Sequence, residues 1–235
     1  ILTIKAPLFE AQLLETAILC VLNHQTLIAT KAARLCQNTD AKIMEFGLRR
    51  AQGPDAGIYG ARAAYIGGCR STSNVLAGQM FGIPVKGTHA HSWVMSFPDE
   101  LTAFRAYAEL YPEGCMLLVD TYDTLKSGVP NAIKVFDELK QKGYKPLGIR
   151  LDSGDLAYLS KEARKMLDDA GHSDCIICVS NDIDEQVLLS LKAQDAKIDL
   201  FGIGTRLITS YDAPSLGGVY KLCAIEENGK LVPKI

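Results

Sequence analysis

The stretch that decides the fold is GIRLDSGDL, residues 148–156, in which a short apolar run passes into arginine, aspartate and serine. The same order occurs in MLLVDTYD (116–123), IICVSND (176–182) and IDLFGIGTR (198–206). Short, almost continuous apolar runs are typical of parallel strands that are covered on both faces. The polar residues that follow each run are therefore predicted at the carboxyl ends of parallel strands.

The segments between these runs have helical patterning, at about 131–141, 156–169 and 184–193, and glycines at 143 and 171 end the first two. Residues 6–36 are also predicted to be helical, with a break near Asn23 and His24 that divides two helices. Alternating strands and helices predict an α/β fold, and we favour an incomplete, TIM-like α/β barrel. In such folds the carboxyl ends of the strands form the functional site.

The domain organisation is predicted from a change of pattern after Gly218. Residues 1–218 are assigned to the α/β barrel core with its leading helices. Residues 219–235 contain two β-type runs around EENG, and we interpret them as the start of an adjoining β-rich domain. The chain begins with Ile1 rather than methionine, so we expect that parts of the protein are missing at both ends.

Composition excludes several classes of protein. The chain has 235 residues and a formal net charge of -2, so generic binding to nucleic acid is not expected. No signal peptide is recognisable, and the early apolar run at 17–22 is too short for a membrane span. The seven cysteines predict reduced thiols and a cytoplasmic location. Cys175 and Cys178 form a C-x-x-C inside a strand-like run, where they would point to opposite faces and pack in the core.

GTHAHSW, residues 87–93, is the most informative segment for chemistry. His89 and His91 are predicted at a strand end. They allow three interpretations: a metal site of a barrel hydrolase, two structural histidines, or one nucleophilic or acid–base histidine oriented by a carboxylate. Asp120 is the candidate for that carboxylate.

Two further strand ends carry candidate ligand groups. The Gly202-x-Gly204 pair with Thr205 exposes backbone N–H groups that are suited to phosphate. Arg150 and Asp152 are two residues apart on a strand and share a face, which suits an anionic ligand and a sugar hydroxyl. Ser153 and Asp155 are alternatively helix caps.

Six motifs occur in order along the chain: Glu45–Gly53, Gly68–Asn74, Gly87–Phe97, Val119–Asp123, Arg150–Asp155 and Phe201–Leu207. Taken together, they resemble the nicotinate phosphoribosyltransferase family. The resemblance implies a type II phosphoribosyltransferase, with an incomplete α/β barrel beside a β-rich domain.

The resemblance implies transfer of phosphoribosyl from phosphoribosyl pyrophosphate to nicotinate, which gives nicotinate mononucleotide and pyrophosphate in NAD salvage. It also implies coupling to ATP hydrolysis and a need for Mg²⁺, with no identified set of protein ligands for the metal. His91 matches the histidine that ATP phosphorylates, and Asp120 matches the carboxylate behind it. A homodimer with shared active sites is implied as well.

The implied substrate contacts come from several strand ends. The Gly202–Gly204 loop and Thr205 are implied to bind the 5′-phosphate. Asp152 and Asn181 are implied to bind the ribose hydroxyls. Arg49 and Arg150 serve the anionic ends of the ligands. Phe46 stacks on the pyridine ring, and Ser73 lies near the nicotinate carboxylate.

Other functions stay open at this level. A nicotinamide enzyme would favour a carboxylate where Ser73 stands, and a quinolinate enzyme would need more cations and no phosphorylated histidine. Different classes are a metal-dependent barrel hydrolase that uses the H-x-H pair, and a non-catalytic scaffold or inactive fragment.

Overall fold

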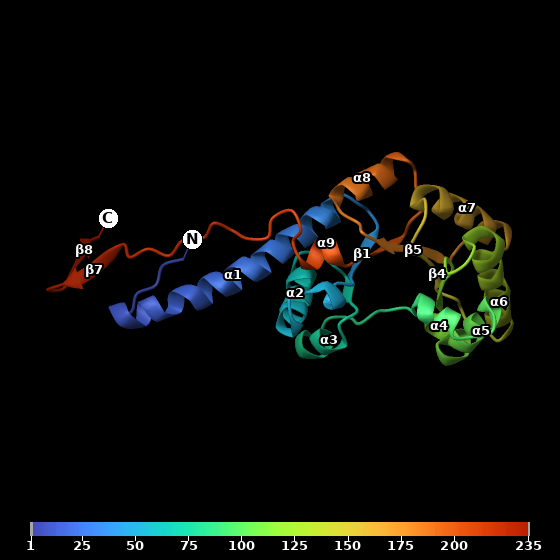
Figure 1. The fold of residues 1–235 in the computed structure, drawn as a ribbon, viewed down its shortest axis with the longest axis horizontal. Helices are drawn as coiled ribbons and strands as arrows, with labels where there is room; N and C mark the ends of the chain where they lie inside the picture. Colours follow the sequence, from blue (N-terminus) through green and yellow to red (C-terminus); the bar gives the residue numbers. More distant parts are fainter. Residues whose placement is uncertain (1, 235) are drawn as a thin grey trace.

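The computed structural model describes residues 2–234, which contain a six-stranded parallel sheet and a separate two-stranded antiparallel hairpin (Figure 1). The strands of the large sheet follow the order β2-β1-β6-β5-β4-β3. Its two edges, β2 and β3, do not pair with each other among the described residues, so the predicted incomplete barrel is confirmed. The strands are β1 (Lys42–Glu45), β2 (Ser71–Thr72), β3 (Met116–Leu118), β4 (Gly148–Leu151), β5 (Ile176–Asn181), β6 (Leu200–Ile203), β7 (Ala224–Glu227) and β8 (Lys230–Pro233).

Helices follow or precede each strand of the parallel sheet, as the alternating pattern predicts. The α-helices are α1 (Leu8–Gln37), α2 (Pro54–Ile66), α3 (Val75–Phe81), α4 (His91–Met95), α5 (Glu100–Leu110), α6 (Val129–Gln141), α7 (Leu156–Asp169), α8 (Glu185–Ala193) and α9 (Thr205–Ile208). Shorter turns are η1 (Leu48–Arg50), η2 (Pro112–Gly114) and the π-helical η3 (Thr124–Gly128). Asp155 and Asp184 cap α7 and α8 by accepting backbone N–H groups, so the capping interpretation of Asp155 is confirmed.

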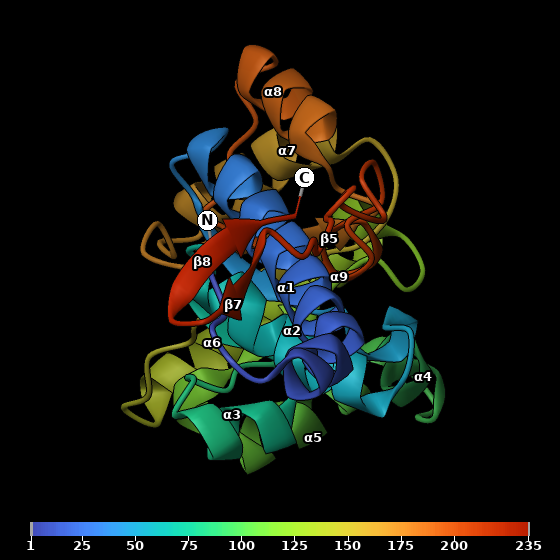
Figure 2. The ribbon, with the colours of Figure 1, turned by 90° about the vertical axis from the view of Figure 1, so that its left-hand side faces the viewer.

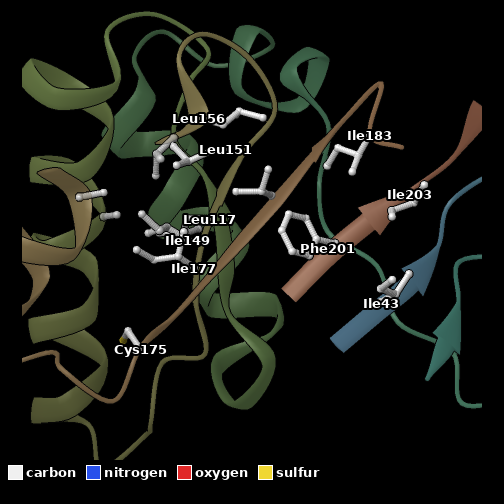
Figure 3. Packing of buried hydrophobic residues seen from close by; sticks show 14 of the residues in the cluster. Ile43, Leu117, Ile149, Leu151, Leu156, Cys175, Ile177, Ile183, Phe201 and Ile203 are labelled. Carbon is white, nitrogen blue, oxygen red and sulfur yellow. The ribbon is translucent and has the colours of Figure 1, made fainter. Parts of the chain in front are cut away.

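The core divides into two clusters because strand side chains alternate between faces. Leu117, Ile149, Ile177 and Phe201 lie on the helix-covered face and belong to the large cluster (Figure 3). On the other face, Met44, Met116 and Cys178 form a much smaller cluster. The inner face of the sheet therefore has few buried apolar side chains. Polar residues occupy this face at the carboxyl ends of the strands.

The C-x-x-C cysteines illustrate this alternation. Cys175 belongs to the large cluster, and Cys178 belongs to the small inner one. Both thiols are buried, as predicted, on different faces of the sheet. Burial raises the pKa of Cys178 to about 12, which keeps it a thiol at neutral pH.

The long first helix corrects one prediction. The chain does not break at Asn23 or His24, because α1 continues through both residues to Gln37. Its C-terminal half packs on α2, whereas its N-terminal half extends away from the sheet toward the β7–β8 hairpin (Figures 1 and 2). By length and composition alone, α1 could cross a membrane. This is a weak indication, since the core helix of a soluble protein passes the same test.

The β7–β8 hairpin turns at Asn228 and Gly229, which both have positive φ, of 52° and 75°. Asn-Gly is the dipeptide that such a two-residue turn favours. The first strand begins at Ala224, later than the run predicted from residue 219. That this hairpin opens a β-rich domain stays a prediction.

Candidate active site

His91 and Asp120 form the centre of the candidate site. His91 Nε2 lies 3.0 Å from Asp120 Oδ1, and Asp120 Oδ2 accepts the Asp152 N–H at 2.9 Å and the Ser153 hydroxyl at 2.6 Å. The Asp120 side chain is 1% exposed, whereas that of His91 is 38% exposed. The fixed carboxylate therefore orients the imidazole with Nε2 toward Asp120, which leaves Nδ1 as the free ring nitrogen.

The position of His91 differs from the predicted strand end. His91 is the first residue of the short helix α4, and the segment before it is an irregular connection from an isolated bridge at Val85. Of the two residues, only Asp120 lies at a strand end, just beyond β3. The contact between His91 and Asp120 agrees with the prediction, because that prediction was based on the carboxylate that follows the strand and did not need His91 to be in a strand.

Arg150 connects four parts of the rim. Its Nε donates to Ser180 Oγ at 2.7 Å, Nη1 donates to Thr88 Oγ1 at 2.7 Å, and Nη2 donates to Asp152 Oδ1 at 2.9 Å. The guanidinium also lies 5.6 Å from the centre of the Phe46 ring. Arg150 therefore holds β4, β5, β1 and the segment before α4 in one arrangement.

Asp152 stays ionised at neutral pH. Burial opposes its ionisation, but the hydrogen bond from Ser180 and the charge of Arg150 together hold the pKa of this carboxyl below its usual value. Both bonds use Oδ1. Among residues 2–234, Oδ2 has no hydrogen-bond donor, so it is an acceptor that a ligand hydroxyl can use.

Glycine at position 202 makes room for the Phe46 ring. A Cβ at Gly202 would lie 2.6 Å from two ring carbons of Phe46, and one at Gly204 would lie 3.0 Å from the Phe46 carbonyl oxygen. The G-x-G sequence and the aromatic residue therefore meet at the ends of β1 and β6. Thr205 begins α9 directly after this contact.

The remaining predicted residues lie around the same edge with fewer contacts to it. Asn181 ends β5 with a φ of 147°, a strained conformation for a residue other than glycine. Ser73 is half-buried, and its N–H donates to the Glu45 carbonyl at 2.9 Å. Arg49 is exposed on η1, and no hydrogen bond or ion pair joins it to the other predicted residues in the described part of the chain.

Three residues of the site have roles that the sequence did not predict. Ser153 donates to Asp120 instead of capping α7, and Ser180 and Thr88 are partners of Arg150. The available signal was their position, since each lies within three residues of a predicted site residue.

Glu45, buried at the end of β1, is a further residue without a role predicted from the sequence. Its Oε2 accepts the Thr72 hydroxyl at 2.6 Å, and Oε1 accepts the Gly47 N–H. Burial raises the pKa of this carboxyl, although the two hydrogen bonds oppose the shift. Glu45 thereby fastens the Phe46 segment to the strand that precedes Ser73.

The two histidines of H-x-H do not converge on a common point. His89 is buried, and its Nε2 accepts the Leu118 N–H at 3.1 Å, whereas His91 faces Asp120. In the part of the chain that the structure describes, no three His, Cys, Asp or Glu side chains are grouped as metal ligands. The donor set therefore does not fit the site of a metal-dependent barrel hydrolase.

Acid is expected to destabilise the protein through His89. Burial is the main cause that lowers the pKa of this imidazole from 6.5 to about 4. Between these values the unfolded chain binds a proton that the folded protein does not, so stability falls as the pH falls from 6.5 toward 4. The loss reaches about 2–3 kcal/mol. Urea unfolding at pH 7 and 4.5 measures it, and His89→Gln should show a smaller loss; equal losses would contradict the assignment.

The family model and the curated relatives name one family. Residues 41–233 match the family model described as the nicotinate phosphoribosyltransferase (NAPRTase) family. The nicotinate phosphoribosyltransferase of Bacillus subtilis (strain 168) is 58% identical over 236 residues, which cover 100% of this chain and 48% of the relative. The Homo sapiens nicotinate phosphoribosyltransferase is 38% identical over 280 residues, with 96% of this chain and 52% of the relative covered.

Similar solved structures include nicotinate phosphoribosyltransferases and also the nicotinate-nucleotide pyrophosphorylase of Pyrococcus furiosus, which has a TM-score of 0.72 and 29% identity over 83% of this chain and 50% of its own. The crystal structure of human nicotinic acid phosphoribosyltransferase has a TM-score of 0.78 and 37% identity, covering 85% of this chain and 51% of its own. The chain spans about half the length of the curated relatives that it matches. Because the family model covers most of the chain, including every motif of the rim, the chain belongs to the nicotinate phosphoribosyltransferase family.

Proposed function

We propose that this chain carries the catalytic rim of an ATP-dependent nicotinate phosphoribosyltransferase that works in NAD salvage. The proposed reaction transfers phosphoribosyl from phosphoribosyl pyrophosphate to nicotinate, giving nicotinate mononucleotide and pyrophosphate. The observation that carries the proposal is the continuous chain of contacts from His91 through Asp120, Asp152 and Arg150 to Phe46. Family membership supports the substrate class.

His91 is proposed to accept the terminal phosphoryl group of ATP. Its Nε2 faces Asp120, so the lone pair of Nδ1 would attack phosphorus while the bond to ADP breaks. Asp120 keeps the proton on Nε2 and stabilises the positive charge that develops on the ring. The phosphohistidine then adds negative charge beside the pyrophosphate site, and water releases it as phosphate after transfer.

The glycosyl transfer is proposed to occur next to Asp152. The bond from C1 of the ribose to pyrophosphate breaks, and a bond from C1 to the pyridine nitrogen forms. By analogy with glycoside chemistry, the ribosyl centre becomes cationic in this step. Asp152, ionised and with Oδ2 available, would hold a ribose hydroxyl and stabilise that charge. Phe46 would support the pyridine ring.

Mg²⁺ fits this rim because it needs only one or two carboxylates in addition to substrate phosphates. Asp152 is the residue that would hold it, directly or through water, since its Oδ2 is available and its charge is retained. When bound, Mg²⁺ neutralises charge on the pyrophosphate leaving group.

The phosphate and carboxylate contacts complete the proposal. Gly204 and Thr205 would hold the 5′-phosphate, and Asn181 would hold a ribose hydroxyl. Arg49 and Ser73 would face the nicotinate carboxylate, with Arg49 reaching the ligand from its exposed position. We also propose that the whole protein is a cytoplasmic homodimer with shared active sites.

Turnover with nicotinate, nicotinamide and quinolinate, each with and without ATP, tests the function. We expect nicotinate to be preferred on the order of 100-fold, because the neutral amide would leave the cationic Arg49 without an anionic partner. ATP should raise the rate with nicotinate. Chromatography of the nucleotide products measures both effects. Equal use of nicotinamide would refute nicotinate as the preferred substrate. ATP-independent use of quinolinate would show that the protein catalyses a different phosphoribosyl transfer.

A further inference from the structure

His89 takes the place of a missing strand partner at the open edge of the sheet. β3 is an edge strand that pairs only with β4 among the described residues, so its other side has backbone groups without a strand partner. On that side the Leu118 N–H donates to His89 Nε2 at 3.1 Å. A side chain therefore satisfies a donor that a neighbouring strand would otherwise satisfy.

The hydrogen bonds of His89 determine its tautomer. Nε2 accepts a hydrogen bond, so in the neutral ring the proton must be on Nδ1, which lies 3.4 Å from the Ala90 carbonyl oxygen. The ring is buried and contacts Phe104 and Tyr107, whose ring centres lie 6.0 and 4.7 Å away. Arg150, whose charge faces the ring, and His91 in its protonated form both disfavour a protonated His89.

The two histidines follow the register of β3. His89 contacts Leu118, and His91, two residues later, contacts Asp120, two residues after Leu118. Only Ala90 separates the two histidines, so the first contact limits where along β3 the second imidazole can lie.

The acceptor at the second contact is already fixed. Asp120 Oδ2 is held by the Asp152 N–H and the Ser153 hydroxyl, so the carboxylate does not need His91 to hold its orientation. The histidine segment is held by Arg150, through Thr88, and by the side chain of His89. Loss of the His89 side-chain contact would leave Arg150, through Thr88 and the His89 carbonyl, as the hydrogen-bonded link from this segment to the sheet.

We propose that His89 is a positioning residue, which holds His91 in register with Asp120 by accepting the Leu118 N–H. This inference rests on the proposed function of His91. The inference gives a function to His89, the first histidine of the H-x-H motif, although His89 itself takes no part in the proposed reaction.

His89→Gln and His89→Asn form a matched pair of variants that differ by one methylene. Glutamine places its oxygen where Nε2 stands and can accept the Leu118 N–H, whereas asparagine is too short to reach it. Both keep a polar amide near Ala90. We expect His89→Asn to lower kcat with nicotinate at least about tenfold, with KM changed by less than about threefold, and His89→Gln to retain most of the rate. Rates are measured below the unfolding midpoint of each variant.

Hydrogen exchange of the Leu118 amide is the structural readout. It should be slow in the wild type and in His89→Gln, and faster in His89→Asn. Unchanged exchange in His89→Asn would overturn the contact, and faster exchange with an unchanged kcat would show a merely structural role. If His89→Asn does not fold, a rate for His89→Gln at least about tenfold below the wild type overturns the inference, and a retained rate supports it. Absence of nicotinate turnover in the wild type would refute the proposed function, while Leu118 exchange still decides the contact.

Discussion

Replacing His91 with alanine is expected to abolish the stimulation by ATP and to lower the rate in the presence of ATP on the order of 100-fold. The His91 imidazole contacts its carboxylate partner through Nε2, which leaves Nδ1 as a free ring nitrogen at this rim. Without it, ATP has no acceptor, and the remaining transfer depends on binding and electrostatics alone. The measurement is the initial rate of nucleotide formation with and without ATP.

Covalent labelling of the protein by ATP is a second measurement for this variant. Protein incubated with ATP labelled at the terminal phosphate should retain acid-labile label in the wild type and none in His91→Ala. His24→Ala is the matched control, since it makes the same substitution on α1 and is expected to keep both label and rate. Stimulation by ATP that survives in His91→Ala would show that another residue accepts the phosphoryl group.

Asp120→Asn should lower the ATP-dependent rate on the order of 1,000-fold, although it keeps the shape of the side chain. Ser153 and the Asp152 N–H both donate to one side of the group, so the amide oxygen must face them. The NH₂ then faces His91 Nε2, which must become an acceptor and move its proton to Nδ1. The nitrogen that attacks ATP thereby loses its lone pair.

The protein contains a matched control for this change. His172 Nε2 lies 2.9 Å from Asp137 Oδ1, which repeats the His91–Asp120 pair away from the strand ends. Asp137→Asn should therefore leave the ATP-dependent rate unchanged, while unfolding in urea reports any loss of stability. A rate in Asp120→Asn equal to that of the control would remove the carboxylate from the mechanism.

Local pattern was sufficient for the parallel strands and the residues at their ends. The predicted apolar runs correspond to β3, β4, β5 and β6, because a strand covered on both faces must be apolar along its whole length. Arg150 and Asp152 were placed on one face by their spacing alone, and they form an ion pair at 2.9 Å. The contact of His91 with Asp120 was anticipated from the same rule of strand ends.

Predictions that depended on the conformation of single segments were less successful. The break at Asn23 and His24 is absent, because α1 packs on α2 over its C-terminal half and polar residues there do not end the helix. His91 begins a helix instead of ending a strand, since the segment before it crosses the open edge of the sheet. Such outcomes depend on contacts with distant residues, which local patterning does not contain.

The sequence by itself determined the alternation of strands and helices between residues 116 and 206, the resemblance to the family and the residues that stand at these strand ends, since these follow from periodicity and motif. Only the tertiary structure decided how those residues share their hydrogen bonds. It assigned Ser153 to Asp120, Ser180 and Thr88 to Arg150, and the Leu118 N–H to His89. The physical reason is that each of these polar groups takes the partner that folding brings within reach, and these partners are 29 to 62 residues apart in the chain.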